Sequence, residues 1–214
     1  MMTPMEIITH SSKTRILDAA LQVIRAKGYS AATLDDICAA AGVTKGSFFH
    51  HFKGKVELAL EAVEHWNQVT GGLFASAPYQ KITDPRKRVL AYIDFRAALV
   101  QGDVPDFTCL LGTMVQETFE TNPPIREACN QGIRLHAQTV AVHLAAAKAR
   151  YAPRASWDPE ALALYTQAVI QGAFILAKAQ GSAKVAIACI HQLRSHVAAL
   201  LSPASVPKPK RSQA

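Results

Sequence analysis

A short segment of the sequence, residues 44–55, gathers side chains that can form hydrogen bonds with a polyanion. Lys45 can donate to guanine, Ser47 can bond to several bases, and Gly46 lets the backbone come close to a partner. Phe48 and Phe52 are four residues apart, so a helix turns both of them inward. The other face then presents Lys45, Ser47, Phe49, His50 and His51. Such a face has the chemistry to recognise base edges in the major groove of DNA.

Three helical segments must position these side chains. Apolar residues recur at helical spacing between Ser12 and Gly28, where the glycine supplies a stop. Thr33 and Thr44 are both good N-caps and precede two short helical segments, the first of which ends at Gly42. Two short helices joined by such a turn predict a helix-turn-helix.

The segment from Gly42 to Lys55 resembles the signature of the TetR family of bacterial transcriptional regulators, and the similarity extends upstream into the first helical segment. The resemblance implies that Thr33 and Thr44 cap helices whose amide ends approach phosphates. It also implies that Lys55 opens a fourth helix beside the DNA backbone. Phe49 takes the position usually held by a phosphate-contacting tyrosine. Because Phe49 lacks the hydroxyl, we expect an apolar contact there, with a thymine methyl group or a sugar.

Composition favours an all-α protein. The 214 residues are 50% hydrophobic and only 7% aromatic, a balance that favours helices over a sandwich or barrel. The net charge of +7 suits a polyanion partner without identifying one. Four cysteines without CxxC spacing, in a chain without a signal-peptide pattern, predict neither disulfides nor a zinc finger. We therefore expect a protein of the reducing cytoplasm.

We expect four regions and about nine helices along the chain. The regions are a flexible N-terminus at 1–11, a helix-turn-helix domain at 12–55, a ligand-binding and dimerisation domain at 56–201, and a disordered basic tail at 202–214. After the helix that starts at Lys55, helices are expected at roughly 85–101, 105–120, 123–151, 158–181 and 183–201.

The roles of the second domain come from the resemblance, which implies a ligand-binding domain that dimerises through its last two helices. Two apolar faces, over 161–179 and 185–200, are wide enough to cover both a core and a partner. The uncharged run 161–177 is shorter than the ~20 residues that span a bilayer. A pocket for an apolar small molecule could draw on Trp66, Phe95, Leu99, Phe107, Met114, Phe119 and Tyr165, with Glu117 or His136 as polar anchors.

Cys109 offers a second kind of signal. The segment that it begins resembles a branch of the family in which a cysteine at the head of the sixth helix responds to electrophiles or oxidants. A thiol near a helix N-terminus is more nucleophilic, so its modification could reposition that helix. The alternative is a small buried hydrophobe. His136 and His143 lie seven apart on one helix face but lack a third ligand, so we expect neither a metal nor a cofactor.

Other function classes lack their sequence signatures. No GxSxG, P-loop or HExxH motif occurs, so we do not expect an enzyme. A membrane-surface protein would use a basic amphipathic helix. The basic residues near the N-terminus lie instead beside the caps and turn of the helix-turn-helix, so we do not expect a membrane partner. The prediction is a homodimeric repressor at a palindromic operator, released by a small-molecule or electrophilic inducer through movement of the fourth helix. The alternative is an architectural DNA-binding protein that needs no ligand.

Overall fold

The computed structural model describes residues 11–202, and within that range the chain forms ten α-helices, one 3₁₀-helix and no strand. The expected all-α class is therefore confirmed for the described part of the chain. The flexible N-terminus and the basic tail expected at the two ends lie, apart from Ser11 and Ser202, outside the described residues.

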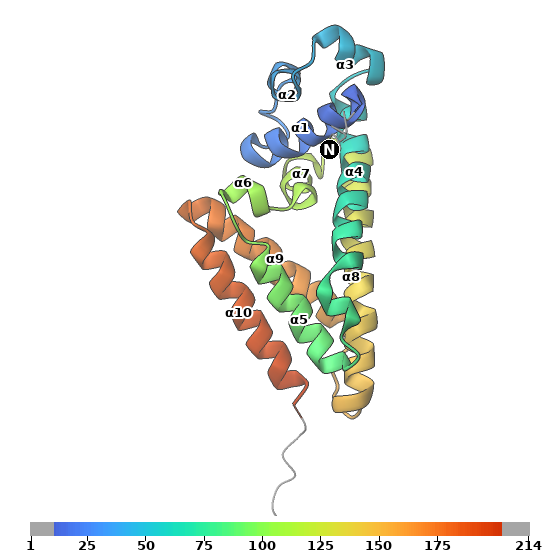
Figure 1. Cartoon of the computed structure of the whole chain (residues 1–214), viewed down its shortest axis with the longest axis vertical. Helices are drawn as coiled ribbons and strands as arrows, with labels where there is room; N and C mark the ends of the chain where they lie inside the picture. The colour runs from blue at the N-terminus through green and yellow to red at the C-terminus, as the bar shows by residue number, and fades with distance from the viewer. Residues whose placement is uncertain (1–10, 203–214) are drawn as a thin grey trace, which may run out of the picture.

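Three short helices form the N-terminal end of the molecule: α1 (Ser12–Lys27), α2 (Leu34–Ala41) and α3 (Lys45–His51) (Figure 1). The predicted caps set these bounds. The Thr33 and Thr44 side chains accept hydrogen bonds from backbone N–H groups in the first turns of α2 and α3. Gly42 then ends α2 at φ 62°, a left-handed conformation that glycine adopts without strain.

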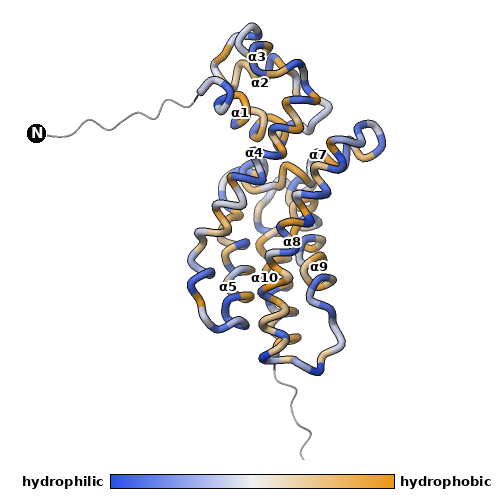
Figure 2. Tube along the Cα trace, turned by 90° about the vertical axis from the view of Figure 1, so that its right-hand side faces the viewer, coloured by the Kyte–Doolittle hydropathy of each residue, from blue (hydrophilic) through white to orange (hydrophobic). Residues whose placement is uncertain are grey.

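Two long helices connect this end of the molecule to the rest. α4 (Lys55–Ser76) and α8 (Pro123–Tyr151) run side by side along one edge (Figure 1). Two further helices, α5 (Pro85–Ala98) and α9 (Pro159–Gln180), pack against α8, and α10 (Ala183–Leu200) packs against both of them. A 3₁₀-helix (Pro78–Lys81) joins α4 to α5. Hydrophobic and hydrophilic residues alternate around the turns of these helices (Figure 2), so each has a face to bury against its neighbours.

The single helix expected over 105–120 is wrong, because the chain forms two helices there. α6 (Val104–Phe107) and α7 (Leu110–Thr118) are separated by Thr108 and Cys109, both in extended conformation. The reason is packing, since Phe107 and Leu110 are buried in different hydrophobic clusters. The break lets the chain cross from one cluster to the other.

These two clusters form the core. One joins α5, α8, α9 and α10. The other joins α1 to α4 with α7 and the start of α8, and it includes Leu110, Met114 and Ile125, all fully buried. Burying a side chain of this size stabilises a fold by roughly 1.5–3 kcal/mol. The N-terminal helices are therefore packed firmly onto α7 and α8, and hydrophobic packing continues across the boundary expected at residues 55 and 56.

Within the described residues, one helix, α9, is long and apolar enough to cross a membrane by length and composition. One side of it, including Ile170, Ala173 and Ala177, is buried against the neighbouring helices of the core. This arrangement is that of a core helix, as expected for the uncharged run that it contains.

Candidate nucleic-acid interface and small-molecule cavity

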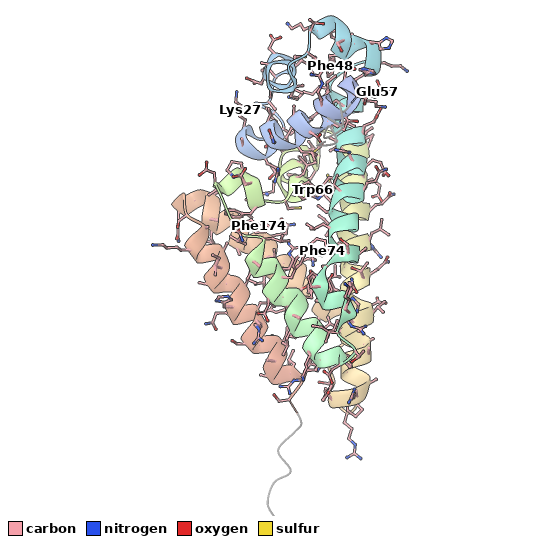
Figure 3. The ribbon with its side chains drawn as sticks, viewed as in Figure 1. Lys27, Phe48, Glu57, Trp66, Phe74 and Phe174 are labelled. Carbon is pink, nitrogen blue, oxygen red and sulfur yellow. The ribbon has the colours of Figure 1, made fainter. Side chains whose placement is uncertain are left out.

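The third helix is anchored by its aromatic residues. Phe48 and Phe52 are both almost completely buried, with ring centroids 5.4 Å apart, so the predicted inward face is confirmed. Phe48 lies among the side chains gathered between the N-terminal helices (Figure 3). The side chain of Thr44 accepts a hydrogen bond from the Ser47 N–H at 3.2 Å, which fixes the start of the helix.

The opposite face of α3 is open to solvent. Lys45 and His50 are exposed, and Phe49 is 56% exposed, an unusual position for a phenylalanine. The Lys45 ammonium group lies 2.7 Å from an Asp35 carboxylate oxygen, which raises the pKa of Lys45. This ion pair is solvent-exposed, so a phosphate or a base can replace Asp35 at little cost. Gly46, between Lys45 and the half-buried Ser47, adds no side chain to this surface.

Two of the predicted DNA-facing residues are bonded within the protein. The His51 Nε2 lies 2.7 Å from the Ser12 hydroxyl, which joins the end of α3 to the start of α1. The Lys55 ammonium donates to the Ser30 carbonyl at 3.1 Å and lies 4.6 Å from the centre of the Tyr29 ring. Burial lowers the pKa of Lys55. Both side chains therefore brace the domain in this structure.

Thr33 has a structural partner as well. Its backbone N–H and hydroxyl both donate to Asp36, whose backbone N–H in turn donates to the Thr33 hydroxyl. A hydrogen bond from Lys27, followed by those from Thr33, lowers the pKa of Asp36 to about 2. Asp36 is therefore ionised at neutral pH and holds the start of α2 in place.

A cavity of about 410 Å³ lies between α4, α5, α8 and α9, with the α6–α7 segment as a further wall. This volume is within the range of small-molecule sites. Figure 3 labels three of its aromatic side chains, Trp66, Phe74 and Phe174, between α4 and α9. Five of the residues expected from the sequence line the cavity: Trp66, Leu99, Phe107, Cys109 and His136.

Five other residues expected at the pocket lie elsewhere. The Phe95 ring packs behind the wall, 5.8 Å from Phe74, and Met114 is fully buried in the cluster beneath α1. Phe119 and Tyr165 are exposed, the latter on the outer side of α9 with its ring 5.6 Å from His196. Glu117 lines a separate, smaller hollow of about 340 Å³ beside the end of α1.

The cavity also contains polar side chains that the sequence did not single out as ligands: Arg96, Gln167 and Gln171. Both glutamines were visible as polar residues within the apolar run of α9, four positions apart and hence on one face. The carboxamide of Gln171 lies where a Cβ on Gly112 would be, so this glycine allows α7 and α9 to approach closely.

One hydrogen-bonded chain crosses the cavity wall. The Gln167 side chain donates to the Tyr92 hydroxyl at 3.4 Å, and the Tyr92 oxygen lies 2.9 Å from His136 Nε2. Burial, and then the positive charge of Arg96, lowers the pKa of His136 to about 3. The imidazole is therefore neutral at physiological pH. Its Nε2 also lies 3.3 Å from an Arg96 guanidinium nitrogen, which can only donate, so Nε2 is the accepting nitrogen and Tyr92 donates to it. Within residues 11–202 no cluster of three or more potential metal ligands occurs.

The segment that lines the cavity also touches the N-terminal helices. The Glu117 carboxylate, near the end of α7, accepts hydrogen bonds from the N–H groups of Tyr29 at 3.1 Å and Ser30 at 2.7 Å. The Arg25 guanidinium donates to the Asp106 carbonyl of α6 at 2.8 Å. A displacement of α6 and α7 within the cavity would therefore act directly on the end of α1 and the turn that follows it.

Comparison with known proteins gives this arrangement a family. Residues 16–62 match the family described as bacterial regulatory proteins, tetR family, and residues 85–193 match the tetracyclin repressor-like C-terminal domain. A crystal structure of a TetR-family transcriptional regulator from Agrobacterium tumefaciens superimposes with a TM-score of 0.76 at 21% identity, over 86% of this chain and 96% of that one.

Curated relatives match over shorter regions. The regulator LmrA of Bacillus subtilis is 28% identical over 131 residues, which are 58% of this chain and 65% of LmrA. The regulator CymR of Pseudomonas putida is 42% identical over 120 residues, 56% of each chain. The chain thus spans less than two thirds of either relative. Together the two domain matches cover most of the described structure, and the chain belongs to the TetR family of bacterial regulatory proteins.

Proposed function

We propose that this protein is a homodimeric, DNA-binding transcriptional regulator of the cytoplasm, which represses by occupying a palindromic operator and leaves when a small molecule enters the cavity. The observation that carries the proposal is the continuity between two sites. The cavity and the N-terminal helices are linked by α7: its N-cap residue Cys109 and its Leu111 line the cavity, and its Glu117 bonds the turn between α1 and α2.

The DNA-binding part of the proposal rests on the open face of α3. The buried Phe48 and Phe52 fix this helix, while Lys45, Phe49 and His50 are exposed and can enter a major groove once Lys45 exchanges Asp35 for a DNA partner. By the family resemblance, the amide ends of α2 and α3 approach phosphates. Lys55 can join them by exchanging the Ser30 carbonyl for a phosphate oxygen.

An apolar stripe on α9 supports a dimer. Leu164, Tyr165, Ile175 and Leu176 are between 45% and 51% exposed and fall on one side of the helix at 100° per residue. Large exposed apolar side chains gathered in this way mark an interaction surface. Pairing of the last two helices of each subunit around a two-fold axis would bury the stripe, and it predicts a palindromic operator.

Release requires that the ligand favours one of two conformations, because equal affinity for both would shift nothing. α4 offers one route, since it starts at Lys55 and contributes Trp66 and Phe74 to the cavity. α7 offers the more direct route, through Glu117. An inducer that shifts either helix would change the spacing of the two α3 helices in the dimer.

Cys109 supports an electrophile as a second trigger. It is the N-cap residue of α7, is half-buried, and lines both the main cavity and the smaller hollow beside α1. A reagent that enters the cavity can therefore reach the thiol, and an adduct there would lie at the start of α7. Replacement of Cys109 by serine should preserve DNA binding and abolish release by an electrophile. Unchanged release would exclude this trigger.

Selection of DNA from a random library by the purified full chain tests the central proposal. A palindromic consensus is the expected result, and Lys45→Ala should change the base preference. Lys55→Ala should instead weaken binding to all sequences and flatten its salt dependence. If no sequence is enriched, the proposal of a sequence-specific regulator is refuted, and the alternative of an architectural DNA-binding protein is favoured. A site that overlaps a promoter, with increased transcription when the protein is removed, would establish repression rather than activation.

A further inference from the structure

The charge of Arg96 is not neutralised within the protein. Its guanidinium lies on the cavity wall, 5.2 Å from the centre of the Phe74 ring and 3.3 Å from His136 Nε2. None of the ion pairs formed among residues 11–202 includes Arg96. A half-buried cation without a counter-ion in an apolar site is an unfavourable arrangement, and a bound anion would relieve it.

The surroundings of Arg96 cannot supply that anion. His136 is neutral, as its lowered pKa requires, and burial, followed by the neighbouring Tyr92, raises the pKa of Tyr79 to about 12. Asp106 is an acidic side chain of the cavity lining, but its carboxylate accepts a hydrogen bond from the Asp103 N–H at 2.8 Å and lies near Arg25. Asp106 therefore stabilises the start of α6 and does not form an ion pair with Arg96.

The rest of the cavity suits a planar ring. Trp66, Phe74, Tyr79, Phe107 and Phe174 lie around it, and aromatic rings favour other rings in offset or edge-to-face geometry. The carboxamides of Gln167 and Gln171 on α9 add neutral hydrogen-bonding groups to the lining. The site thus combines an aromatic enclosure with one uncompensated planar cation.

We propose that the cavity binds a small aromatic carboxylic acid, whose carboxylate pairs with Arg96 and whose ring lies among the aromatic side chains of α4, α6 and α9. A carboxylate matches the fork of a guanidinium and carries one negative charge, which one arginine neutralises. A phosphate dianion would leave charge unpaired in an apolar site. This inference rests on the proposed function only for the consequence of binding and not for binding itself.

Calorimetric titration of the full chain without DNA tests the ligand class, with 2-naphthoate, its neutral isostere 2-naphthamide, and the aliphatic acid octanoate as probes. We expect 2-naphthoate to bind about tenfold or more tightly than the amide, because a charge-assisted bond is lost in the amide. It should also bind more tightly than octanoate. Equal affinities for acid and amide, or no binding of 2-naphthoate at millimolar concentration, would overturn the proposal. Equal affinity for octanoate would overturn its aromatic part.

Variants locate the charge that is responsible. Arg96→Gln should remove the preference for acid over amide, and Arg96→Lys should retain part of it. Arg134, an exposed residue of α8, gives the matched control, since Arg134→Gln should leave both affinities unchanged. A preference that survives in Arg96→Gln would refute the role of Arg96, and the comparison of acid with amide in the wild type stands even if this variant fails to fold.

Operator binding measured separately distinguishes this proposal from the proposed function. If 2-naphthoate binds with the expected preference but leaves DNA binding unchanged, the ligand class stands and release by that ligand fails. If DNA is bound and released by other compounds while the acid and its amide bind equally, the regulatory function stands and the assignment of Arg96 fails.

Discussion

His136 should make the stability of the protein depend on pH in a way that one substitution removes. In the folded protein its pKa is about 3, whereas the ordinary value is 6.5. The unfolded chain therefore binds a proton on this imidazole between pH 6.5 and 3, and the folded chain does not. The stability contributed by the neutral, buried imidazole is fully present above pH 6.5 and declines as the pH falls toward 3.

The magnitude follows from the difference in pKa. Below the unfolded-state pKa of 6.5, each pH unit stabilises the protonated unfolded chain by about 1.4 kcal/mol relative to the folded chain. At pH 5, about 1.5 units below that pKa, the unfolded chain has gained about 2 kcal/mol. We therefore expect this residue alone to lower the free energy of unfolding by about 2 kcal/mol between pH 7.5 and pH 5. This loss is a large fraction of the 5–15 kcal/mol that is typical of a folded domain.

Urea unfolding at pH 7.5 and pH 5 measures the effect, at one protein concentration because the stability of the proposed dimer would depend on concentration. His136→Gln retains a hydrogen-bonding side chain but does not titrate, so its loss of stability between the two pH values should be about 2 kcal/mol smaller than that of the wild type. His50→Gln, at an exposed imidazole of α3, tests whether the loss of any histidine has the same effect. The same pH dependence in wild type and His136→Gln would refute a neutral, buried His136.

Three further outcomes are expected. Glu117→Ala removes both hydrogen bonds to the α1–α2 turn. The factor by which an inducer weakens operator binding should then fall by about fivefold or more. Glu120→Ala, at an exposed residue just after α7, should leave this factor unchanged. Phe48→Ala should lower the free energy of unfolding by about 3–5 kcal/mol, whereas the neighbouring exposed Phe49→Ala should change it by about 0.5 kcal/mol or less, both by urea unfolding. Leu164→Asp should convert the proposed dimer to a monomer in sedimentation analysis, whereas Val142→Asp, at a valine of α8 that is even more exposed, should not. A dimer that persists in Leu164→Asp would place the interface elsewhere.

Local features of the chain could be predicted because neighbouring residues determine them. The bounds of α2 and α3 follow from Thr33, Gly42 and Thr44, each of which bonds or turns the backbone within a few residues. The inward face of α3 follows from the four-residue spacing of Phe48 and Phe52. In these cases the sequence contains both the signal and the partner, so no knowledge of the tertiary structure is needed.

The remaining features depend on partners that are distant in sequence. His51 meets Ser12, 39 residues away, and Glu117 meets Tyr29, 88 residues away, so neither contact has a local pattern. α9 is apolar on most of its surface, and periodicity does not reveal which side faces the cavity. The sequence therefore predicts Tyr165 at the pocket, but this residue is exposed, whereas Gln167, two positions on, lines the cavity.

The break between α6 and α7 determines how the cavity and the DNA-binding helices can be coupled. Before the break, Phe107 packs against Phe174 in the cluster of α5, α8, α9 and α10. After the break, Leu110 and Met114 are buried beneath α1. From Leu110 to Glu117 the helix rises about 10 Å, so a ligand contact near its start reaches the α1–α2 turn within one rigid element. At an exposed position two hydrogen bonds contribute roughly 1–3 kcal/mol in total, which is the range of typical allosteric coupling free energies. The two hydrogen bonds of Glu117 therefore have the strength that the proposed release requires, and a ligand that displaced α7 could break them.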